Sequence, residues 1–320
     1  SVAAVRVDAR PIRSFHKDGG EHRQIGKLVW RGGLVLSSAS QHFGGYSGLE
    51  IAEDGSRILA VSDAGTWLSA RVVYDGERPT GLDDAKTGPV LALGGRQLDR
   101  AKDRDAEAIR LLSGTLERGR ALLAFERNQR IGTFVIEKGE LRQPLSYLRP
   151  PVRLPSNKGL EAVALFTGGP YRGSVVAFAE RRKDANGHHT GWIWKRGKAH
   201  PLALTDDGGF DVTDLAALPD GSLIVLERRY RPFEGVKLRL RLVPAQRVRI
   251  GGVLSGITLV NADMRYEIDN MEGLAVHRDK RGRTILTLIS DNNFNPLLQR
   301  TVLLQFELPH AALALRDKSD

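Results

Sequence analysis

Two sets of acidic residues recur along the chain at nearly constant spacing. The first set lies beside small or apolar runs and consists of Glu50, Glu107, Glu161, Asp214 and Glu272, at intervals of 57, 54, 53 and 58 residues. The second set ends the apolar run that follows each of these, and consists of Asp63, Glu126, Glu180, Glu227 and Asp291. Carboxylates repeated in this way suit two kinds of chemistry: the binding of hard cations through oxygen, and acid–base catalysis.

The segments that carry these acids have the pattern of β-hairpins. Gly and Asp residues separate the two apolar runs of each pair, as in Pro219-Asp220-Gly221, which is turn chemistry. Third runs follow at Thr133–Ile136, Gly191–Trp194 and Lys237–Leu242. The last of these alternates basic residues with leucines, which predicts a half-buried outer strand with its three basic side chains on the solvent face. Fourth runs precede several of the acids, at Val90–Leu93, Leu202–Leu204 and Ile257–Val260.

Four short strands in a repeat of about 50 residues predict an all-β fold, a single β-propeller of four-stranded blades. The repeats begin near residues 47, 105, 158, 211 and 270, so we expect five blades in one domain that spans residues 1–320. The last repeat is one strand short after Val302–Phe306, and Gly33–Ser38 near the N-terminus is the strand expected to complete it. The alternative is a six-bladed ring, with residues 1–45 and the C-terminal tail forming the extra blade.

In a propeller the first strand of each blade lines the central tunnel, so we expect the first set of acids to form a ring there and the second set to flank it. Ten carboxylates cannot all stay ionised and unpaired in one tunnel. Bound hard cations, paired arginines and retained protons are three possible solutions, and the acids can also be staples that hold the blades together. If a cation is bound, all ten acids are candidate ligands, and oxygen-only coordination suits Ca²⁺.

Roles in catalysis follow from the same pattern. Glu107, Glu161 and Glu272 are the candidate catalytic residues. Basic residues beside the second acids are the candidates for holding an anionic substrate, and these are Arg127, Arg181, Arg228 and also Lys158 near the tunnel entrance. The mixed charge run Asp99–Asp105 has the composition of a solvated loop between blades.

Composition excludes several function classes. The 320 residues contain no cysteine, which excludes a disulfide scaffold, thiolate catalysis and iron–sulfur clusters. The net charge of +10 is spread along the chain, and aromatic residues are only 6%, so nucleic-acid binding is not expected. No run of 18 uncharged apolar residues is present, so no membrane span is expected. Neither a phosphate-binding glycine loop nor a nucleophile elbow occurs, and the eight dispersed histidines do not predict a transition-metal site.

Several stretches resemble the phytase-like family of exported bacterial proteins, known by the description "esterase-like activity of phytase". They include Gly44–Glu50, Ser62–Gly65, Glu126–Arg130, Asn157–Ala162 and Ile289–Asn295. Together with matches at Phe210–Asp214, Leu226–Tyr230 and Asn270–Glu272, the resemblance covers roughly residues 25–308. It implies a propeller, a periplasmic or secreted location, and hydrolysis of phosphate or carboxylate esters.

Two functions from different classes are compatible with these observations. The first is a metal-dependent hydrolase that acts on a small anionic or ester substrate at the acid-lined tunnel mouth. The second is a non-catalytic periplasmic binding propeller for a cation or small ligand. In both cases we expect a monomer with no nucleic-acid partner.

Overall fold

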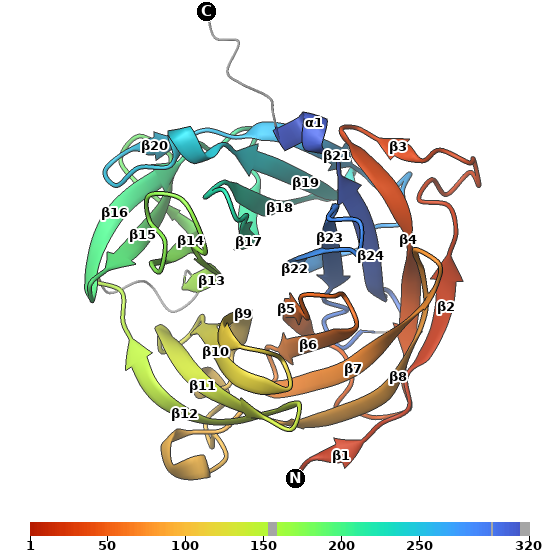
Figure 1. Ribbon diagram of the computed structural model, residues 1–320, viewed down its shortest axis with the longest axis horizontal. Coiled ribbons are helices and arrows are strands. Elements are labelled where there is room, and N and C mark those ends of the chain that lie inside the picture. Colours follow the sequence, from red (N-terminus) through yellow and green to blue (C-terminus); the bar gives the residue numbers. More distant parts are fainter. Residues whose placement is uncertain (153–158, 296, 314–320) are drawn as a thin grey trace, which may run out of the picture.

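Five β-sheets stand in a ring around a central tunnel (Figure 1). The computed structural model describes the chain except for residues 153–158, 296 and 314–320, and the side chains of Glu180 and Arg181 also lie outside the description. The prediction of an all-β propeller with five blades is confirmed. None of the helices in the described part of the chain is long and apolar enough to cross a membrane.

Each blade is a meander of antiparallel strands that runs outward from the tunnel. Blade 1 contains β5 (Tyr46–Ile51), β6 (Arg57–Ser62), β7 (Thr66–Asp75) and β8 (Arg78–Pro89), with β1 (Ala3–Ala4) on its outer edge. Blade 2 contains β9 (Ala106–Gly114), β10 (Arg118–Phe125), β11 (Arg130–Glu137) and β12 (Glu140–Leu148). Blade 3 contains β13 (Leu160–Leu165), β14 (Val175–Lys183), β15 (His189–Lys195) and β16 (Lys198–Leu204), with β20 (Val253–Leu254) outside β16.

The remaining two blades complete the ring. Blade 4 contains β17 (Asp211–Ala217), β18 (Leu223–Arg231), β19 (Gly235–Val243) and β21 (Ile257–Ala262). Blade 5 contains β22 (Met271–Arg278), β23 (Thr284–Ser290), β24 (Thr301–Leu308), β4 (Leu28–Ser37) and β2 (Asp8–Ile12), and β3 (Gln24–Ile25) pairs with β4. Helical turns are short and consist of Leu93–Gly95, Ala101–Asp103, Ala245–Arg247 and α1 (His310–Leu313).

The N-terminal strand closes the ring as the sequence predicted. β4 pairs antiparallel with β24, with Leu34 opposite Leu303. The N-terminal and C-terminal parts of the chain therefore share one sheet, which removes a free edge from the last blade.

The hydrophobic core lies between neighbouring blades. Leu59 and Trp67 of blade 1, for example, pack in one buried cluster with Ile109, Leu123 and Phe134 of blade 2. Each sheet is covered on both faces in this way, which explains the continuous apolar runs in the inner strands. Interblade packing also fixes where each first strand stands relative to the tunnel.

Two expectations about individual strands were wrong. Val90–Leu93 is not a fourth strand, because β8 ends at Pro89 and a helical turn begins at Leu93. Lys237–Leu242 does lie in a strand, β19, but Arg239 and Arg241 do not face solvent and are only 6% and 1% exposed. The cost of burying these two charges is offset by an acidic side chain on the neighbouring strand, which is described below.

Candidate functional site

A β-bulge occurs near the start of the first strand of every blade. In each case one residue of the first strand has no partner in the register with the second strand, and these residues are Ser47, Glu107, Glu161, Thr213 and Glu272. A bulge changes the direction of the local side chains and is common next to active sites. The bulge position is therefore the true structural repeat of the tunnel wall.

This register corrects the predicted ring of five equivalent acids. Glu107, Glu161 and Glu272 occupy equivalent positions, but blades 1 and 4 have Ser47 and Thr213 there. Glu50 lies three residues beyond the bulge of its strand, and Asp214 lies one residue beyond. The two hydroxyl residues bond to the next blade instead: Ser47 Oγ donates to Ala106 O, and Thr213 Oγ1 lies 3.3 Å from Met271 O.

Glu50 and Asp214 meet a buried arginine inside the tunnel. Arg110 of β9 is 5% exposed, and its Nη2 lies 3.0 Å from Oδ2 of Asp214, while its Nη1 lies 3.8 Å from Oε1 of Glu50. Arg110 also donates to the carbonyl oxygens of Leu49, Leu215 and Leu274, so one side chain of blade 2 binds blades 1, 4 and 5. Glu50 and Asp214 are therefore paired with an arginine, and with it they act as staples that hold the blades together.

Among the described side chains, seven other carboxylates gather where the first strands begin and the second strands end. We call them the carboxylate cluster, and its members are Asp63, Asp105, Glu107, Glu126, Glu161, Glu272 and Asp291. Oxygen atoms of Asp105, Glu107 and Glu126 all lie within 4.8 Å of one another. These residues come from four blades, which only the ring brings together.

The electrostatics of the cluster show that its negative charges are crowded. Burial and the carboxylates of Asp291 and Asp105 raise the pKa of Asp63 to about 7. Burial raises the pKa of Asp291 to about 6, and the carboxylates of Asp105 and Asp269 add to this effect. The pKa of Glu107 is raised well above its usual value by burial, by Glu161, and by a hydrogen bond with Asp105. Without a cation, part of the cluster therefore retains protons at neutral pH.

Two arginines provide positive charge at the edges of the cluster. Arg228 Nη1 lies 2.9 Å from Glu272 Oε1 and also bonds to Asn270 Oδ1. In β18 the residue that pairs with the position before the bulge is Glu227. Arg228 follows it directly, and this is the position that the second acids hold in the other blades. Arg127 Nε lies 3.3 Å from Asp105 Oδ2. Blade 4 thus contributes a cation to the cluster where blades 1, 2 and 5 contribute acids.

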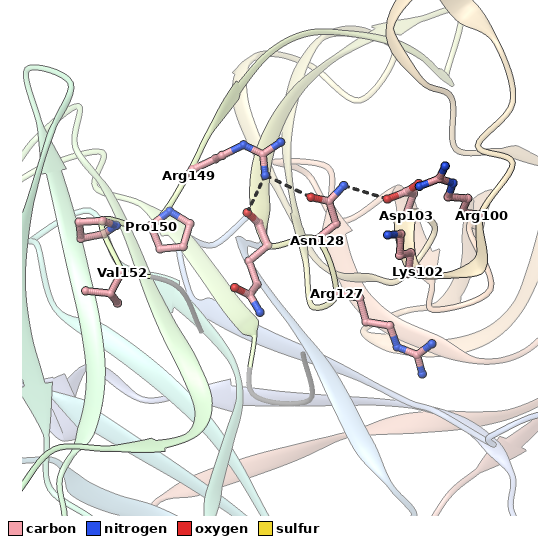
Figure 2. A pocket seen from close by; sticks show the side chains of 10 residues that line it. Arg100, Lys102, Asp103, Arg127, Asn128, Arg149, Pro150 and Val152 are labelled. Atoms are coloured by element: carbon pink, nitrogen blue, oxygen red, sulfur yellow. Dashed lines mark hydrogen bonds between the residues drawn. The ribbon is translucent and has the colours of Figure 1, made fainter. Parts of the chain in front are cut away.

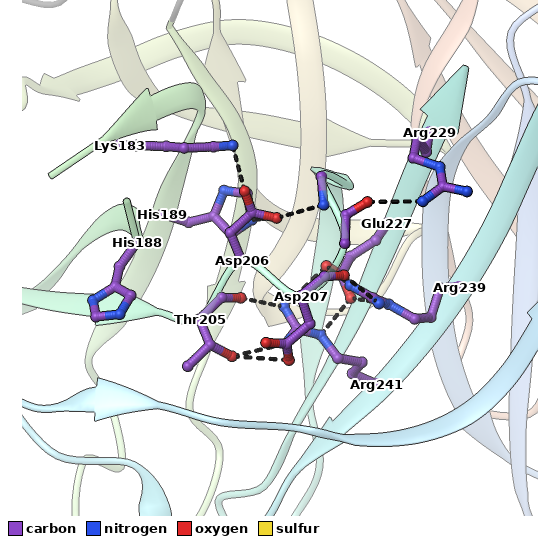
Figure 3. A network of polar contacts seen from close by, with 12 residues as sticks. Lys183, His188, His189, Thr205, Asp206, Asp207, Glu227, Arg229, Arg239 and Arg241 are labelled. Carbon is purple, nitrogen blue, oxygen red and sulfur yellow. Dashed lines mark hydrogen bonds and ion pairs between the residues drawn. The ribbon is translucent and has the colours of Figure 1, made fainter. Parts of the chain in front are cut away.

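Glu227 belongs to a separate buried network (Figure 3). Its side chain is fully buried, and its Oε2 accepts hydrogen bonds of 2.9 Å from both Arg239 Nη2 and Arg241 Nη2. Arg241 also bonds to Asp207 and Thr205. The prediction that Glu227 flanks the tunnel as a metal ligand is therefore wrong, because its oxygens are occupied by two guanidinium groups.

A cation-rich cavity of about 650 Å³ adjoins the cluster (Figure 2). Arg100, Lys102, Arg127 and Arg149 line it, and Asp103 is the one acidic residue among its described lining residues. Asp103 Oδ1 accepts a hydrogen bond of 2.8 Å from Asn128, whose side-chain oxygen in turn accepts from Arg149 at 3.2 Å. In Figure 2 Arg127 points away from this chain of hydrogen bonds. Because Arg127 lines the cavity and also contacts Asp105, it joins the cavity to the carboxylate cluster.

Sequence reasoning missed two residues of this region. Asp105 was assigned to a solvated charge run, yet it is 7% exposed and lies at the centre of the cluster. The available signal was its position two residues before Glu107. Arg110 was not singled out at all, although it is the one basic residue of its inner strand, β9. Lys158 and the side chains of Glu180 and Arg181 lie outside the described residues, so their predicted roles stay predictions.

A comparison with known families gives one decisive match. The profile of the phytase-like family, described as esterase-like activity of phytase, matches residues 41–294. The chain belongs to this family. The matched range contains the whole carboxylate cluster and all five bulges.

Other comparisons add little to the family assignment. A search of curated proteins finds no match. Among solved structures, hydrazine synthase of Kuenenia stuttgartiensis is similar over 87% of this chain and 81% of its own, with a TM-score of 0.40 and 10% identity. Similarity at that level supports no conclusion about function, so the function proposed below depends on the residues of the site.

Proposed function

We propose that this protein is a divalent-cation-dependent hydrolase of phosphate esters, which acts where the carboxylate cluster meets the cation-rich cavity. The observation that carries the proposal is the position of Arg127, which lines the cavity and lies 3.3 Å from Asp105 of the cluster. A site for an anionic group and a site for a divalent cation therefore share one boundary. Membership of the phytase-like family supports hydrolysis as the reaction class.

The donor set of the cluster fits a hard cation. Asp105, Glu107 and Glu126 present only carboxylate oxygens, all within 4.8 Å, which suits Ca²⁺ or Mg²⁺ and not a softer metal. The raised pKa values of Asp63, Glu107 and Asp291 indicate an excess of negative charge that a divalent cation would neutralise. In this proposal Asp105, Glu107 and Glu126 hold the ion, with Asp63, Glu161, Glu272 and Asp291 around it. When bound, the ion supplies Lewis acidity and lowers the pKa of a coordinated water.

The chain's own residues supply the remaining functions. Arg100, Lys102, Arg127 and Arg149 provide four positive charges against one carboxylate, which favours a phosphate group in the cavity. Hydrolysis adds one water across the phosphorus–oxygen ester bond, with loss of a proton from the water and gain of a proton by the leaving alcohol. Glu161, buried next to Glu107, is the residue placed to hold and transfer protons, while Glu107 binds the ion.

Assays with two model substrates, p-nitrophenyl phosphate and p-nitrophenyl acetate, test this proposal. We expect Ca²⁺ to support hydrolysis of p-nitrophenyl phosphate by the purified protein, and excess EDTA to abolish it. Glu107→Gln should remove both Ca²⁺ binding, measured by calorimetry, and hydrolysis. Glu53→Gln is the matched control, since Glu53 lies beyond Glu50 on the Arg110 side of the tunnel, where it lines a different cavity.

Three outcomes separate the alternatives. Turnover of p-nitrophenyl acetate in place of the phosphate would keep the hydrolase and change the substrate class. Binding of Ca²⁺ and phosphate without turnover of either ester would identify a non-catalytic binding propeller. Wild-type behaviour of Glu107→Gln in both assays would overturn the proposal. Based on the family resemblance, we also propose a periplasmic or secreted location, which fractionation would check. We further propose a monomeric state, which light scattering would check.

A further inference from the structure

A second group of potential metal ligands lies on the outer side of blade 5, in the loop between β2 and β3. His16, Asp18 and His22 each offer one ligand atom, and these three atoms all lie within 4.8 Å of one another. The imidazole rings of His16 and His22 have their centroids 4.3 Å apart. This donor set differs in kind from the carboxylate cluster, because two of its three ligands are nitrogens.

The loop is held in place before any ion binds. Ser14 Oγ lies 3.0 Å from His16 O and 2.7 Å from Gly20 O, which closes the turn across its base. The backbone of His16 forms an isolated antiparallel β-bridge with that of Tyr266, and the backbone N–H of Lys17 donates to Arg265 O at 3.0 Å. Phe15, next to His16, is fully buried. The ligands are therefore carried by a loop that is fixed to the propeller at several points.

Gly20 allows the two exposed ligands to approach each other. A Cβ atom at position 20 would lie 2.6 Å from Nε2 of His22 and 3.2 Å from Oδ1 of Asp18. The backbone of Gly20 is not in the left-handed region, so local conformation does not require glycine here. Its bare Cα leaves the space in which His22 and Asp18 converge.

We propose that His16, Asp18 and His22 form a binding site for a first-row divalent transition cation, with Zn²⁺ as its representative. Two imidazoles and one carboxylate are a common three-ligand set for zinc, and water can occupy the fourth position. All three ligands lie in the loop between β2 and β3, so the bound ion would cross-link this loop, which leads through β3 to the closing strand β4. This site is independent of the proposed hydrolase function.

Calorimetry on the full chain tests the proposal, with Zn²⁺ titrated in the presence of saturating Ca²⁺. Calcium occupies oxygen sites and leaves the histidine site available. We expect one zinc ion to bind, and His16→Ala and His22→Ala each to weaken its affinity by at least about 10-fold. Gly20→Ala should weaken it as well, although this substitution removes no ligand. His42→Ala, which removes an exposed histidine outside the group, should leave the affinity unchanged.

Two further measurements test whether the ion lies at these three residues. Co²⁺ in place of Zn²⁺ should give a visible absorption band that disappears in His22→Ala. Zn²⁺ should raise the melting temperature of the wild-type protein and not that of His22→Ala, while both proteins melt at the same temperature without metal. Full zinc binding by His22→Ala, or loss of wild-type zinc binding on addition of Ca²⁺, would overturn the proposal, because the ion would then lie elsewhere.

Discussion

Arg110 and Asp214 meet across the axis of the propeller, where Nη2 of the arginine lies 3.0 Å from Oδ2 of the aspartate. They belong to β9 and β17, which are not neighbours along the chain and lie in different blades. Burial raises the pKa of Asp214 to about 7, and the charge of Arg110 opposes this rise. The pair is a structural element of the tunnel, because Arg110 also bonds to carbonyl oxygens of three other blades.

Replacing this arginine is expected to destabilise the whole ring. Arg110→Met leaves Asp214 buried without its counter-charge and removes one hydrogen-bond donor from each of three carbonyl oxygens. Loss of one partner of a buried ion pair costs about 3–5 kcal/mol, and urea unfolding would measure it. Arg110→Met/Asp214→Asn should recover part of the loss. Arg120→Met, at an exposed position of the same blade, is the control, and equal stability of the two single variants would contradict the role of Arg110.

Glu227→Gln is expected to reduce stability, because it removes the buried carboxylate that pairs with both Arg239 and Arg241 and leaves Asp207 as the acidic partner of Arg241 alone. Both guanidinium groups lie 2.9 Å from Oε2 of Glu227. A loss of about 2–4 kcal/mol in the free energy of unfolding is expected. Chemical denaturation at pH 7 would measure it, and a variant as stable as the wild type would show that the network contributes nothing net.

Asp63→Asn is expected to have the opposite effect on the metal-free protein. The pKa of Asp63 is raised to about 7 in the folded state, so the folded protein binds more protons than the unfolded chain between pH 4 and 7. The stability linked to this group is therefore complete below its unfolded pKa and is lost as the pH rises through about 7. The amide cannot ionise, so the variant should be more stable than the wild type at pH 8, by roughly 1–2 kcal/mol after allowance for partial exposure.

The pH dependence of this difference provides the check. Melting curves in EDTA should show that Asp63→Asn and the wild type have similar stability at pH 4, near the unfolded pKa of this carboxyl, and differ at pH 8. Saturating Ca²⁺ should remove the advantage of the variant at pH 8, because the ion would neutralise the wild-type carboxylate. A variant that is less stable than the wild type at every pH would show that Asp63 serves as a hydrogen-bonded staple.

Arg127→Gln is expected to weaken binding of a phosphate substrate more than it slows the chemical step. Arg127 lines the cation-rich cavity and is about half exposed, so its removal should not unfold the protein. We expect KM to rise by roughly 10-fold, which corresponds to about 1.4 kcal/mol of ground-state binding, with a smaller change in kcat. Steady-state kinetics would measure both. Arg118→Gln, an exposed arginine at the start of β10, is the control, and an equal effect of both substitutions would remove Arg127 from the site.

Much of the fold could be predicted from the sequence. The five repeats, their hairpins and the closing strand near Gly33 follow from local features: turn residues, apolar runs and their spacing. The exterior position assigned to Lys237–Leu242 was wrong for a physical reason. Alternation of charged and apolar residues shows that the two faces of the strand differ in polarity, but it does not show which face is buried. Here the charged face is buried, because Glu227 on the neighbouring strand lies opposite the arginines and bonds to them.

The candidate site was predicted less well, and one tripeptide shows why. Gly-Leu-Glu occurs at residues 48–50 and again at 159–161, and the two were aligned as equivalents. In the structure Glu161 is the bulge residue of its strand, whereas Glu50 lies three residues beyond the bulge at Ser47. Glu161 therefore lies in the carboxylate cluster and Glu50 binds Arg110.

The sequence by itself determined the number of blades, their order and the presence of many acids near one axis, because these depend on local periodicity. Tertiary structure alone decided which acids meet each other and which meet arginine. The bulges shift the register by one residue in every blade, and the partners Arg110, Arg239 and Arg241 become neighbours of their acids only when the sheets pair and the ring closes. The charge state of each carboxylate depends on those neighbours and on burial, and neither can be deduced from position along the chain.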